Sequence, residues 1–269
     1  MNECKFTIPG NRRILLVEDV EMNQFLASRK IESWGVKVDI AHNGKMAVEM
    51  VQKGHYDLVL MDIQMPVMDG FEATRHIRSI PDASKACVPI IALSANILNG
   101  DDERYMEAGM NGYVCKPFDD QRLFNIITLN LKNGSMSAEP LNAPKVKASE
   151  AQPATREKLY DLTMVESIAG GDTGFVKKMV QIFLDTMPPS VIQLNQALEK
   201  KDWESLSKLA HKMKSTIDSM GIQPLREVIR TIEANGKNKT DLENLPSLVR
   251  KVNVVLEACL EQLRRDFGS

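Results

Sequence analysis

Acidic side chains follow two short apolar runs in the first half of the chain. Glu18 and Asp19 come directly after residues 14–17, and Asp62 comes directly after residues 58–61. Three carboxylates brought together would repel one another unless a cation lay between them. Oxygen ligands of this kind suit Mg²⁺, which takes few carboxylates and keeps several waters. The pattern therefore predicts a magnesium site, with Asp62 beside it as a nucleophile.

Two more polar side chains stand at the ends of apolar runs. Ser94 ends the run at 89–93, and Lys116 follows the run at 113–115. A hydroxyl and an ammonium beside a carboxylate–Mg²⁺ cluster can hold the oxygens of a phosphoryl group. With Asp62 as the nucleophile, the product of such a reaction would be an aspartyl-phosphate.

Apolar runs alternate with amphipathic stretches over the first half of the chain. The predicted strands are 14–17, 36–40, 58–61, 89–93 and 113–115. The predicted helices are 21–34, 44–53, 71–79, 98–108 and 119–131. Five strand–helix alternations predict an α/β doubly wound five-stranded parallel sheet, covered by helices on both faces. The carboxyl ends of its strands would gather the polar residues in one crevice.

The second half of the chain has a different character. Residues 132–156 are rich in Ala, Ser, Pro and Lys and have no apolar period, which predicts a flexible linker. Every periodic segment after it is helical, which predicts an all-α helical bundle. Pro188-Pro189 should kink or restart one of its helices. Gly221 is expected to end another.

His211 lies in the predicted helix 203–220. At 100° per residue, the apolar side chains of this helix form a stripe roughly 100° wide, and His211 lies about 150° from its centre. We therefore expect its ring to be exposed. An imidazole can accept a phosphoryl group, and Lys214, one turn along, would offset the phosphate charge.

Four segments of the first half resemble the receiver domain of two-component response regulators and hybrid histidine kinases. They are ILLVEDVEMNQ (14–24), DLVLMDIQMPVMDG (57–70), PIIALSAN (89–96) and GYVCKPF (112–118). The resemblance extends over residues 11–131 and implies a flavodoxin-like receiver domain.

The resemblance to a receiver implies a role for each residue of the cluster. Asp62 matches the phosphoacceptor, Asp19 the direct Mg²⁺ ligand, and Glu18 a residue that acts on the ion through water. The backbone carbonyl of Gln64 matches a further ligand. The switch hydroxyl, the invariant-type lysine and the aromatic switch residue match Ser94, Lys116 and Tyr113.

The segment AHKMKSTIDSMG (210–221) resembles the histidine-containing phosphotransfer (HPt) domain, a four-helix bundle. The similarity extends over residues 157–267. His211 matches the phosphorylated histidine, and Lys214 matches the lysine three residues later. The sequence departs from the family at Ser215, where glycine is usual, and at Asp218, where a small residue is usual. Asp218 would repel a phosphoryl group.

The composition limits the classes of partner. The formal net charge is −2, so no basic excess indicates nucleic-acid binding. No apolar run approaches the roughly 18 residues that cross a bilayer, and the first ten residues lack the apolar core of a secretory signal. The four cysteines form no Cys/His cluster of the kind that binds zinc. We expect a cytoplasmic protein without membrane contact.

These patterns together predict a phosphorelay protein, in which phosphoryl groups pass between histidine and aspartate. Its cofactor would be Mg²⁺, and its partners would be a histidine kinase, downstream response regulator receiver domains, or both. Neither a Gly-rich ATP lid nor a P-loop motif is found, so we expect no ATP-binding kinase domain in this chain. The chain would be a stand-alone intermediate or the C-terminal part of a hybrid sensor histidine kinase.

Two interpretations from other classes stay open. An Asp-nucleophile phosphohydrolase would carry a second aspartate two residues after the nucleophile, where this chain has Gln64. A scaffold that binds through its helical bundle would need neither Asp62 nor His211 to be phosphorylated.

Overall fold

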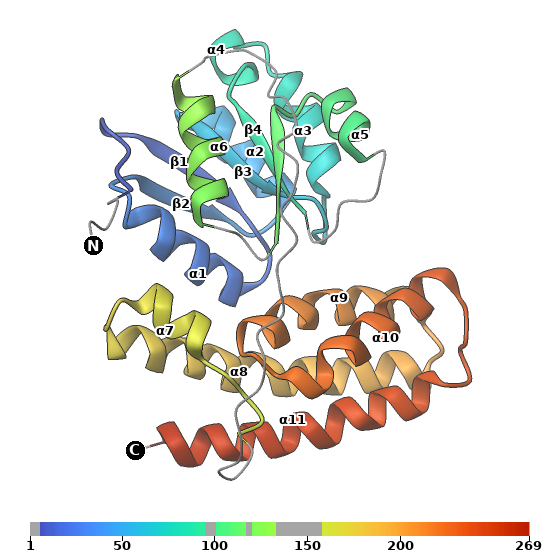
Figure 1. Ribbon diagram of the computed structural model, residues 1–269. Coiled ribbons are helices and arrows are strands. Elements are labelled where there is room, and N and C mark those ends of the chain that lie inside the picture. The colour runs from blue at the N-terminus through green and yellow to red at the C-terminus, as the bar shows by residue number, and fades with distance from the viewer. Residues whose placement is uncertain (1–5, 95–100, 117–119, 133–157, 269) are drawn as a thin grey trace. The chain divides into compact units, whose positions relative to one another are not determined.

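The computed structural model describes residues 6–94, 101–116, 120–132 and 158–268 of the 269-residue chain. The chain folds into two compact units, unit 1 (Met1–Val146) and unit 2 (Lys147–Ser269) (Figure 1). The predicted linker, 132–156, lies outside the described residues except for its first residue, which ends a helix.

Unit 1 is built on a parallel sheet. Its strands are β1 (Arg13–Val17), β2 (Lys37–Ala41), β3 (Leu58–Asp62), β4 (Ile90–Ser94) and β5 (Gly112–Cys115). The strand order is β2-β1-β3-β4-β5, and every neighbouring pair is parallel. The order changes direction between β1 and β3, and sheets of this kind bind ligands beyond the carboxyl ends of the strands at that point. The predicted five-stranded doubly wound sheet is confirmed.

Helices cover both faces of the sheet (Figure 1). They are α1 (Glu21–Glu32), α2 (Gly44–Lys53), α3 (Gly70–Arg78), α4 (Ala83–Ala86), α5 (Asp101–Glu107) and α6 (Asp120–Lys132). Alternate residues of β1 enter different cores: Leu15 and Val17 pack with α2 and α3, whereas Ile14 and Leu16 pack with α1 and α6. Because the central strands β3 and β4 are buried on both faces, they are apolar up to their last residues, Asp62 and Ser94.

The helices of unit 1 match the expected ones apart from their ends and one addition. The predicted helix 98–108 is α5, and residues 98–100 lie outside the described part of the chain. The short helix α4 was not predicted. Its four residues are too few to show a helical period, and the Asp82 side chain caps it by accepting from the N–H of Ser84.

All of the secondary structure described in unit 2 is helical. It contains α7 (Thr163–Ala169), α8 (Thr173–Glu199), α9 (Trp203–Ser219), a 3-10 turn η1 (Gln223–Leu225), α10 (Arg226–Asn238) and α11 (Leu245–Phe267). The helix α8 contacts α9, α9 contacts α10, α10 contacts α11, and α11 returns to α8 (Figure 1). Four helices in a closed ring of contacts form the predicted four-helix bundle.

The helix α8 continues through Pro188 and Pro189, so of the two outcomes predicted there, a kink or a restart, the restart is wrong. Each proline removes one backbone donor. Buried side chains on both sides of the pair, including Phe183 and Leu194, keep the two halves packed in one bundle. Packing against the neighbouring helices therefore outweighs the missing hydrogen bonds.

The helix α9 ends as predicted at Gly221. Gly221 has φ +61°, and its N–H donates to the carbonyl of Asp218 at 3.1 Å. The next N–H, of Ile222, donates to the carbonyl of Ile217 at 3.1 Å, which completes a Schellman motif. A Cβ at Gly221 would lie 2.5 Å from the carbonyl oxygen of Asp161. Only glycine fits this position.

Among the residues that the structure describes, no helix combines the length and the apolar character needed to cross a membrane.

Replacing Gly221 with alanine should destabilise unit 2 more than the same change at Gly170. Both glycines have a left-handed φ, +61° and +56°, but a Cβ at Gly170 meets no atom within 4 Å. We expect Gly170→Ala to cost about 1 kcal/mol of unfolding free energy, from backbone strain alone. Gly221→Ala should cost at least about 2 kcal/mol, because a steric clash is added. Urea unfolding followed by circular dichroism measures both, and equal losses would contradict this account of Gly221.

Candidate functional site

The carboxyl ends of β1 and β3 bring three acidic side chains together. The strands pair with Val17 opposite Met61, so the residues that follow, Glu18 and Asp62, are also neighbours. The ligand oxygens of Glu18, Asp19 and Asp62 all lie within 4.8 Å of one another. Glu18 is 1% exposed and Asp62 is 5% exposed. The structure thus places these three side chains in one cluster, in which Glu18 and Asp62 are buried and Asp19 is half-buried.

Lys116, at the end of β5, reaches into this cluster. Its Nζ donates to Asp62 Oδ2 at 2.6 Å and also to Glu18 Oε2. Its backbone N–H donates to the carbonyl of Ser94 at 2.7 Å, which continues the pairing of β4 and β5. Burial acts to lower the pKa of Lys116, but the carboxylates of Glu18 and Asp62 outweigh it and raise that pKa above its usual value.

Asp62 has an unusual pKa for a carboxyl group. Burial, followed by the charges of Glu18 and Asp19, raises the pKa of Asp62 to about 6, while the ammonium of Lys116 acts in the opposite direction. At neutral pH the carboxylate is therefore ionised but poorly solvated. Such an oxygen is a candidate nucleophile.

Hydrogen bonds from the backbone and from neighbouring side chains orient these carboxylates. Glu18 Oε1 accepts from the N–H of Val20 at 3.1 Å and from Asn23 Nδ2 at 3.0 Å. The N–H of Gln64 donates to Asp62 Oδ1 at 3.3 Å. This contact is made by the backbone N–H of Gln64 and not by its carbonyl. The role of the Gln64 carbonyl as a metal ligand therefore stays a prediction.

The donor set fits a divalent cation. It supplies hard oxygens from three carboxylates, and among the described residues the ammonium of Lys116 pairs with two of them, Glu18 and Asp62. Mg²⁺ favours oxygen ligands of this type. The residues Glu18, Asp19 and Asp62 are therefore suited to hold such an ion.

Ser94, at the end of β4, is 7% exposed and lies beside a group of aromatic side chains. Its Oγ accepts from the hydroxyl of Tyr105 at 3.1 Å. The ring of Tyr105 lies 5.5 Å from that of Tyr113 and stacks on Phe71 at 5.7 Å. Sequence reasoning selected Ser94 and Tyr113 but not Tyr105, because a tyrosine within an amphipathic helix gives no signal of its own.

His211 forms a second cluster, in unit 2, with a residue from the neighbouring helix. Its Nδ1 lies 2.5 Å from Glu233 Oε1, and Lys214 Nζ donates to Glu233 Oε2 at 2.7 Å. The histidine side chain is 19% exposed. The ring is therefore less exposed than expected, although it is not buried, because α10 packs beside α9 and places Glu233 against the imidazole.

Glu233 was not identified from the sequence. Burial acts to raise its pKa, but the hydrogen bonds and charges of His211 and Lys214 outweigh burial and lower that pKa to about 2. Glu233 is therefore a carboxylate at neutral pH and accepts a hydrogen bond from Nδ1 of His211, which leaves Nε2 outside this contact. The contact joins residues 22 positions apart on different helices, so periodicity within either helix could not reveal it.

Asp218, which the sequence suggested would repel a phosphoryl group, is matched by two guanidinium groups. Arg230 Nη2 donates to Asp218 Oδ2 at 2.6 Å, and Arg226 Nε donates to Oδ1 at 3.2 Å. Both arginines come from α10, as Glu233 does. The positive charges that offset Asp218 in α9 therefore come from arginines of the neighbouring helix α10.

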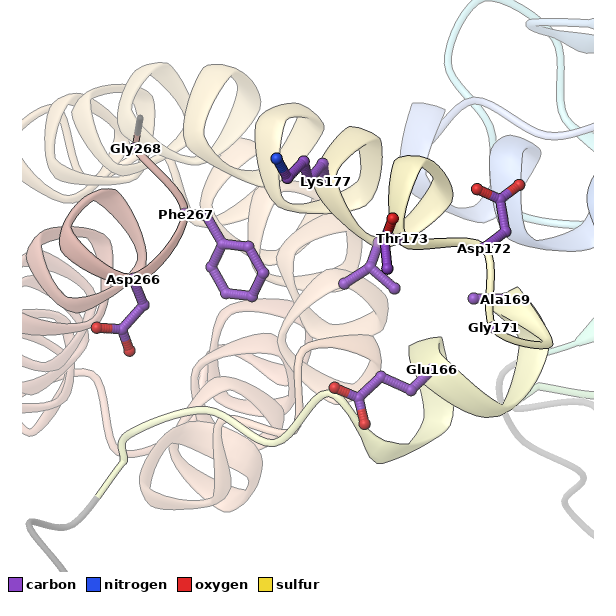
Figure 2. Close-up of a pocket in the computed structure, with 10 residues that line it drawn as sticks. Glu166, Ala169, Gly171, Asp172, Thr173, Lys177, Asp266, Phe267 and Gly268 are labelled. Carbon is purple, nitrogen blue, oxygen red and sulfur yellow. The ribbon is translucent and has the colours of Figure 1, made fainter.

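A pocket of about 490 Å³ lies elsewhere in unit 2, between α7, the start of α8 and the end of α11 (Figure 2). Its polar lining comes from Glu166, Asp172, Thr173, Lys177 and Asp266, and the ring of Phe267 faces into it. None of the predicted site residues lines this pocket. It is separate from both clusters described above.

Two known families match this chain, one in each unit. The family described as "Response regulator receiver domain" matches residues 14–128, and the "Hpt domain" family matches residues 178–266. These matches lie within the predicted ranges 11–131 and 157–267.

Two curated relatives are sensor proteins of Escherichia coli K12. The signal transduction histidine-protein kinase BarA is 30% identical over 250 residues, which cover 91% of this chain and 27% of BarA. The aerobic respiration control sensor protein ArcB is 30% identical over 257 residues, which cover 94% of this chain and 30% of ArcB. The chain thus spans less than a third of the length of these relatives.

Among solved structures, the receiver domain of a sensor histidine kinase from Pseudomonas aeruginosa PAO1 is 40% identical, with a TM-score of 0.43. The match covers 46% of this chain and 100% of that domain, which was crystallised with a magnesium ion in its active site cleft.

Replacing Glu233 with glutamine should destabilise unit 2 in a pH-dependent way. Because the folded-state pKa of Glu233 is about 2, below its usual 4.5, its stabilisation is complete above pH 4.5 and is lost as the pH falls toward 2. We expect Glu233→Gln to lose about 1–2 kcal/mol at pH 7, after allowance for solvent screening, and less at pH 3.5. Urea unfolding at both pH values measures the difference.

Glu204→Gln is the matched control, because Glu204 pairs with Lys208 within α9 at 2.6 Å but both side chains are largely exposed. This variant should unfold like the wild type at both pH values. A loss for Glu233→Gln that did not change with pH would refute the charge pairing.

Proposed function

We propose that the chain, in which a response regulator receiver domain is followed by an Hpt domain, is a phosphorelay protein with Asp62 and His211 as its two phosphoacceptors. The observation that carries the proposal is the cluster at the carboxyl edge of the sheet. There the Asp62 carboxylate lies among Glu18, Asp19 and Lys116.

In the first half-reaction, a carboxylate oxygen of Asp62 attacks the phosphorus of the donor. The new O–P bond forms as the bond between phosphorus and the donor breaks, and the leaving group departs with its electron pair. Lys116, already hydrogen-bonded to Asp62 Oδ2, offsets negative charge at the reacting oxygens.

Glu18, Asp19, Asp62 and the carbonyl of Gln64 are the proposed ligands of Mg²⁺. Asp19 and Asp62 would bind it directly, and Glu18 would bind it through water. When bound, the ion would neutralise negative charge on the phosphoryl oxygens. The three carboxylates whose ligand oxygens lie within 4.8 Å of one another support this assignment.

In the second half-reaction, a phosphoryl group passes between an aspartyl-phosphate and His211. The Nε2 lone pair attacks phosphorus, the N–P bond forms, the O–P bond breaks, and the aspartate returns to a carboxylate. Glu233 holds the Nδ1 proton throughout and offsets the positive charge on the ring. Lys214 fixes the other oxygen of Glu233 and stays near the phosphoryl group.

Phosphorylation of Asp62 would change the surface of the receiver through Ser94. In the structure its hydroxyl accepts from Tyr105. A phosphoryl oxygen would compete for Ser94, so the contact with Tyr105 and the neighbouring ring of Tyr113 would be rearranged. This proposal makes the aromatic group the two-state element of the receiver.

The proposed partners are a histidine kinase, a downstream response regulator receiver domain, or both. Alignment of 91% of this chain with 27% of the histidine-protein kinase BarA favours a role as the C-terminal part of a hybrid sensor kinase. A stand-alone intermediate would use the same two acceptors.

Radiolabelled acetyl phosphate with Mg²⁺ tests both acceptors. We expect the wild-type chain to take acid-stable label at Asp62, an acyl phosphate, and base-stable label at His211, a phosphoramidate. His211→Ala should keep only the acid-stable label. Asp62→Ala should take neither, because His211 receives its phosphoryl group from Asp62. Removal of Mg²⁺ with EDTA should lower labelling by at least about a hundredfold.

The alternatives give different results. Steady release of phosphate from small phosphomonoesters, abolished by Asp62→Ala, would identify a phosphohydrolase instead. Absence of any label, with unchanged partner binding by both variants, would identify a scaffold.

A further inference from the structure

Gln24, in the first turn of α1, is a buried polar residue that has no part in the chemistry proposed above. It ends the segment VEDVEMNQ (17–24), which also supplies Glu18 and Asp19, and it is 5% exposed. A carboxamide buried to this degree is costly unless it is hydrogen-bonded. The partners of Gln24 therefore indicate what its side chain does.

The carboxamide of Gln24 joins the ends of two strands. Its Nε2 donates to the backbone carbonyl of Glu18, directly after β1, at 2.5 Å, and lies 2.8 Å from Nδ1 of His42, directly after β2. A carbonyl oxygen can only accept, so the group that faces Glu18 is the amide NH₂ and not the amide oxygen. The second hydrogen of this NH₂ is donated to Nδ1. The neutral ring of His42 therefore carries its proton on Nε2.

The hydrogen bond from Gln24 acts on the peptide group that joins two of the clustered carboxylate residues. The carbonyl of Glu18 lies in the same planar group as the N–H of Asp19. On the other side, the N–H of Glu18 donates to the carbonyl of Ala41 at 3.0 Å, which continues the pairing of β1 and β2. The peptide groups before and after Glu18 are thus both held, so the main chain that carries Glu18 and Asp19 has little freedom to turn.

Electrostatic repulsion within the cluster makes such a restraint important. The ligand oxygens of Glu18, Asp19 and Asp62 lie within 4.8 Å of one another, and like charges at this distance favour a rotation of the chain that separates them. A cation removes the repulsion when it binds. It binds more tightly, however, when its ligands are already in place, because ordering them reduces the net free energy of binding.

We propose that Gln24 is a positioning residue for the divalent cation, which holds the peptide group between Glu18 and Asp19 in place and uses His42 as a second anchor. This inference rests on the proposed function, because it takes the carboxylate cluster as the Mg²⁺ site. Gln24 and His42 were not selected from the sequence, since neither a carboxamide within a helix nor a single histidine after a strand predicts such a contact.

The proposal separates affinity for the ion from the chemistry at Asp62. The described contacts of the Gln24 carboxamide are to Glu18 and His42, whereas the reacting oxygen of Asp62 is held by Lys116. Loss of the carboxamide should therefore raise the Mg²⁺ concentration that the site needs. At saturating Mg²⁺ the ion itself holds its ligands, so the rate of phosphorylation should be unchanged.

The test replaces Gln24 with methionine in the full chain. Methionine has a similar length and volume, but its thioether cannot donate a hydrogen bond. Titration with MgCl₂, followed by the amide chemical shifts of ¹⁵N-labelled protein, should give a dissociation constant about tenfold higher for Gln24→Met than for the wild type. Labelling by radioactive acetyl phosphate should reach half of its maximal rate at a correspondingly higher Mg²⁺ concentration, with the maximal rate within about twofold of the wild type.

The ring of His42 provides a second measurement that does not depend on the ion. Its ¹⁵N chemical shifts at about pH 8, where a solvated imidazole is neutral, should show the proton on Nε2 in the wild type. In Gln24→Met the ring should relax toward the mixture of tautomers of a solvated imidazole. Loss of packing alone would not release the ring in this way.

Two further variants distinguish positioning from a change in the fold. Gln121→Met is the matched control, because Gln121 donates to Asn125 at 2.8 Å within α6 and is exposed, and it should change neither the affinity nor the rate. His42→Phe removes the second anchor at an exposed position and leaves Gln24 in place. It should raise the Mg²⁺ dissociation constant by about threefold, with a thermal midpoint without Mg²⁺ close to that of the wild type.

Wild-type affinity for Mg²⁺ in Gln24→Met would overturn the proposal. A loss of the maximal rate without a change in affinity would also overturn it, and so would an equal loss of affinity in Gln121→Met. If Gln24→Met does not fold, unchanged affinity in His42→Phe overturns the proposal and a lower affinity supports it. If the wild-type chain itself binds no Mg²⁺ and takes no label at Asp62, the proposed function fails, which is a different result from wild-type affinity in the variants.

Discussion

The pairing of the Lys116 ammonium with the carboxylates of Glu18 and Asp62 is the interaction on which the receiver site depends. Buried carboxylates are costly unless an opposite charge and hydrogen bonds compensate them. Here the three residues come from β1, β3 and β5, so the compensation exists only when the sheet has its correct order and register. The two apolar cores, one on each face of the sheet, fix that register and so fix the charges.

Each of the two proposed acceptors has a side chain of opposite charge beside it, a cation for Asp62 and an anion for His211. Asp62 is a nucleophilic carboxylate that needs a cation beside it, and Lys116 supplies one. His211 is a nucleophilic imidazole that becomes positive when phosphorylated, and Glu233 supplies the anion. In each case a partner from a neighbouring strand or helix sets the charge around the reacting atom. A carboxylate with a raised pKa and an imidazole held by a carboxylate are both suited to give and to receive a phosphoryl group.

Close backbone approach around the receiver site explains two of its glycines. A Cβ at Gly70 would lie 2.3 Å from the carbonyl oxygen of Asp62, and a Cβ at Gly44 would lie 2.6 Å from that of Met68. These contacts hold the loop after β3 against the sheet. The same constraint places strain at Val67 of this loop, which has φ +73°, because a loop fixed at both ends has few ways to turn.

The sequence by itself determined the fold class, the strand ends and the candidate acceptors. Alternation of apolar runs with helical stretches is a local property, and parallel strands place Glu18 and Asp62 at one edge whatever the details of packing. A helical period likewise placed His211 outside the apolar stripe of its helix. Local signals also misled, since Pro188 and Pro189 are read as a break when only the residues around them are considered.

Tertiary structure alone decided which charges meet. Glu233 binds His211 across two helices, Arg230 matches Asp218 across the same seam, and Tyr105 binds Ser94 from another element. No spacing within one element encodes these contacts, because they depend on how neighbouring elements pack and on which rotamers the packing allows. Burial has the same origin: the ring of His211 is partly covered by α10, which the period of α9 could not indicate.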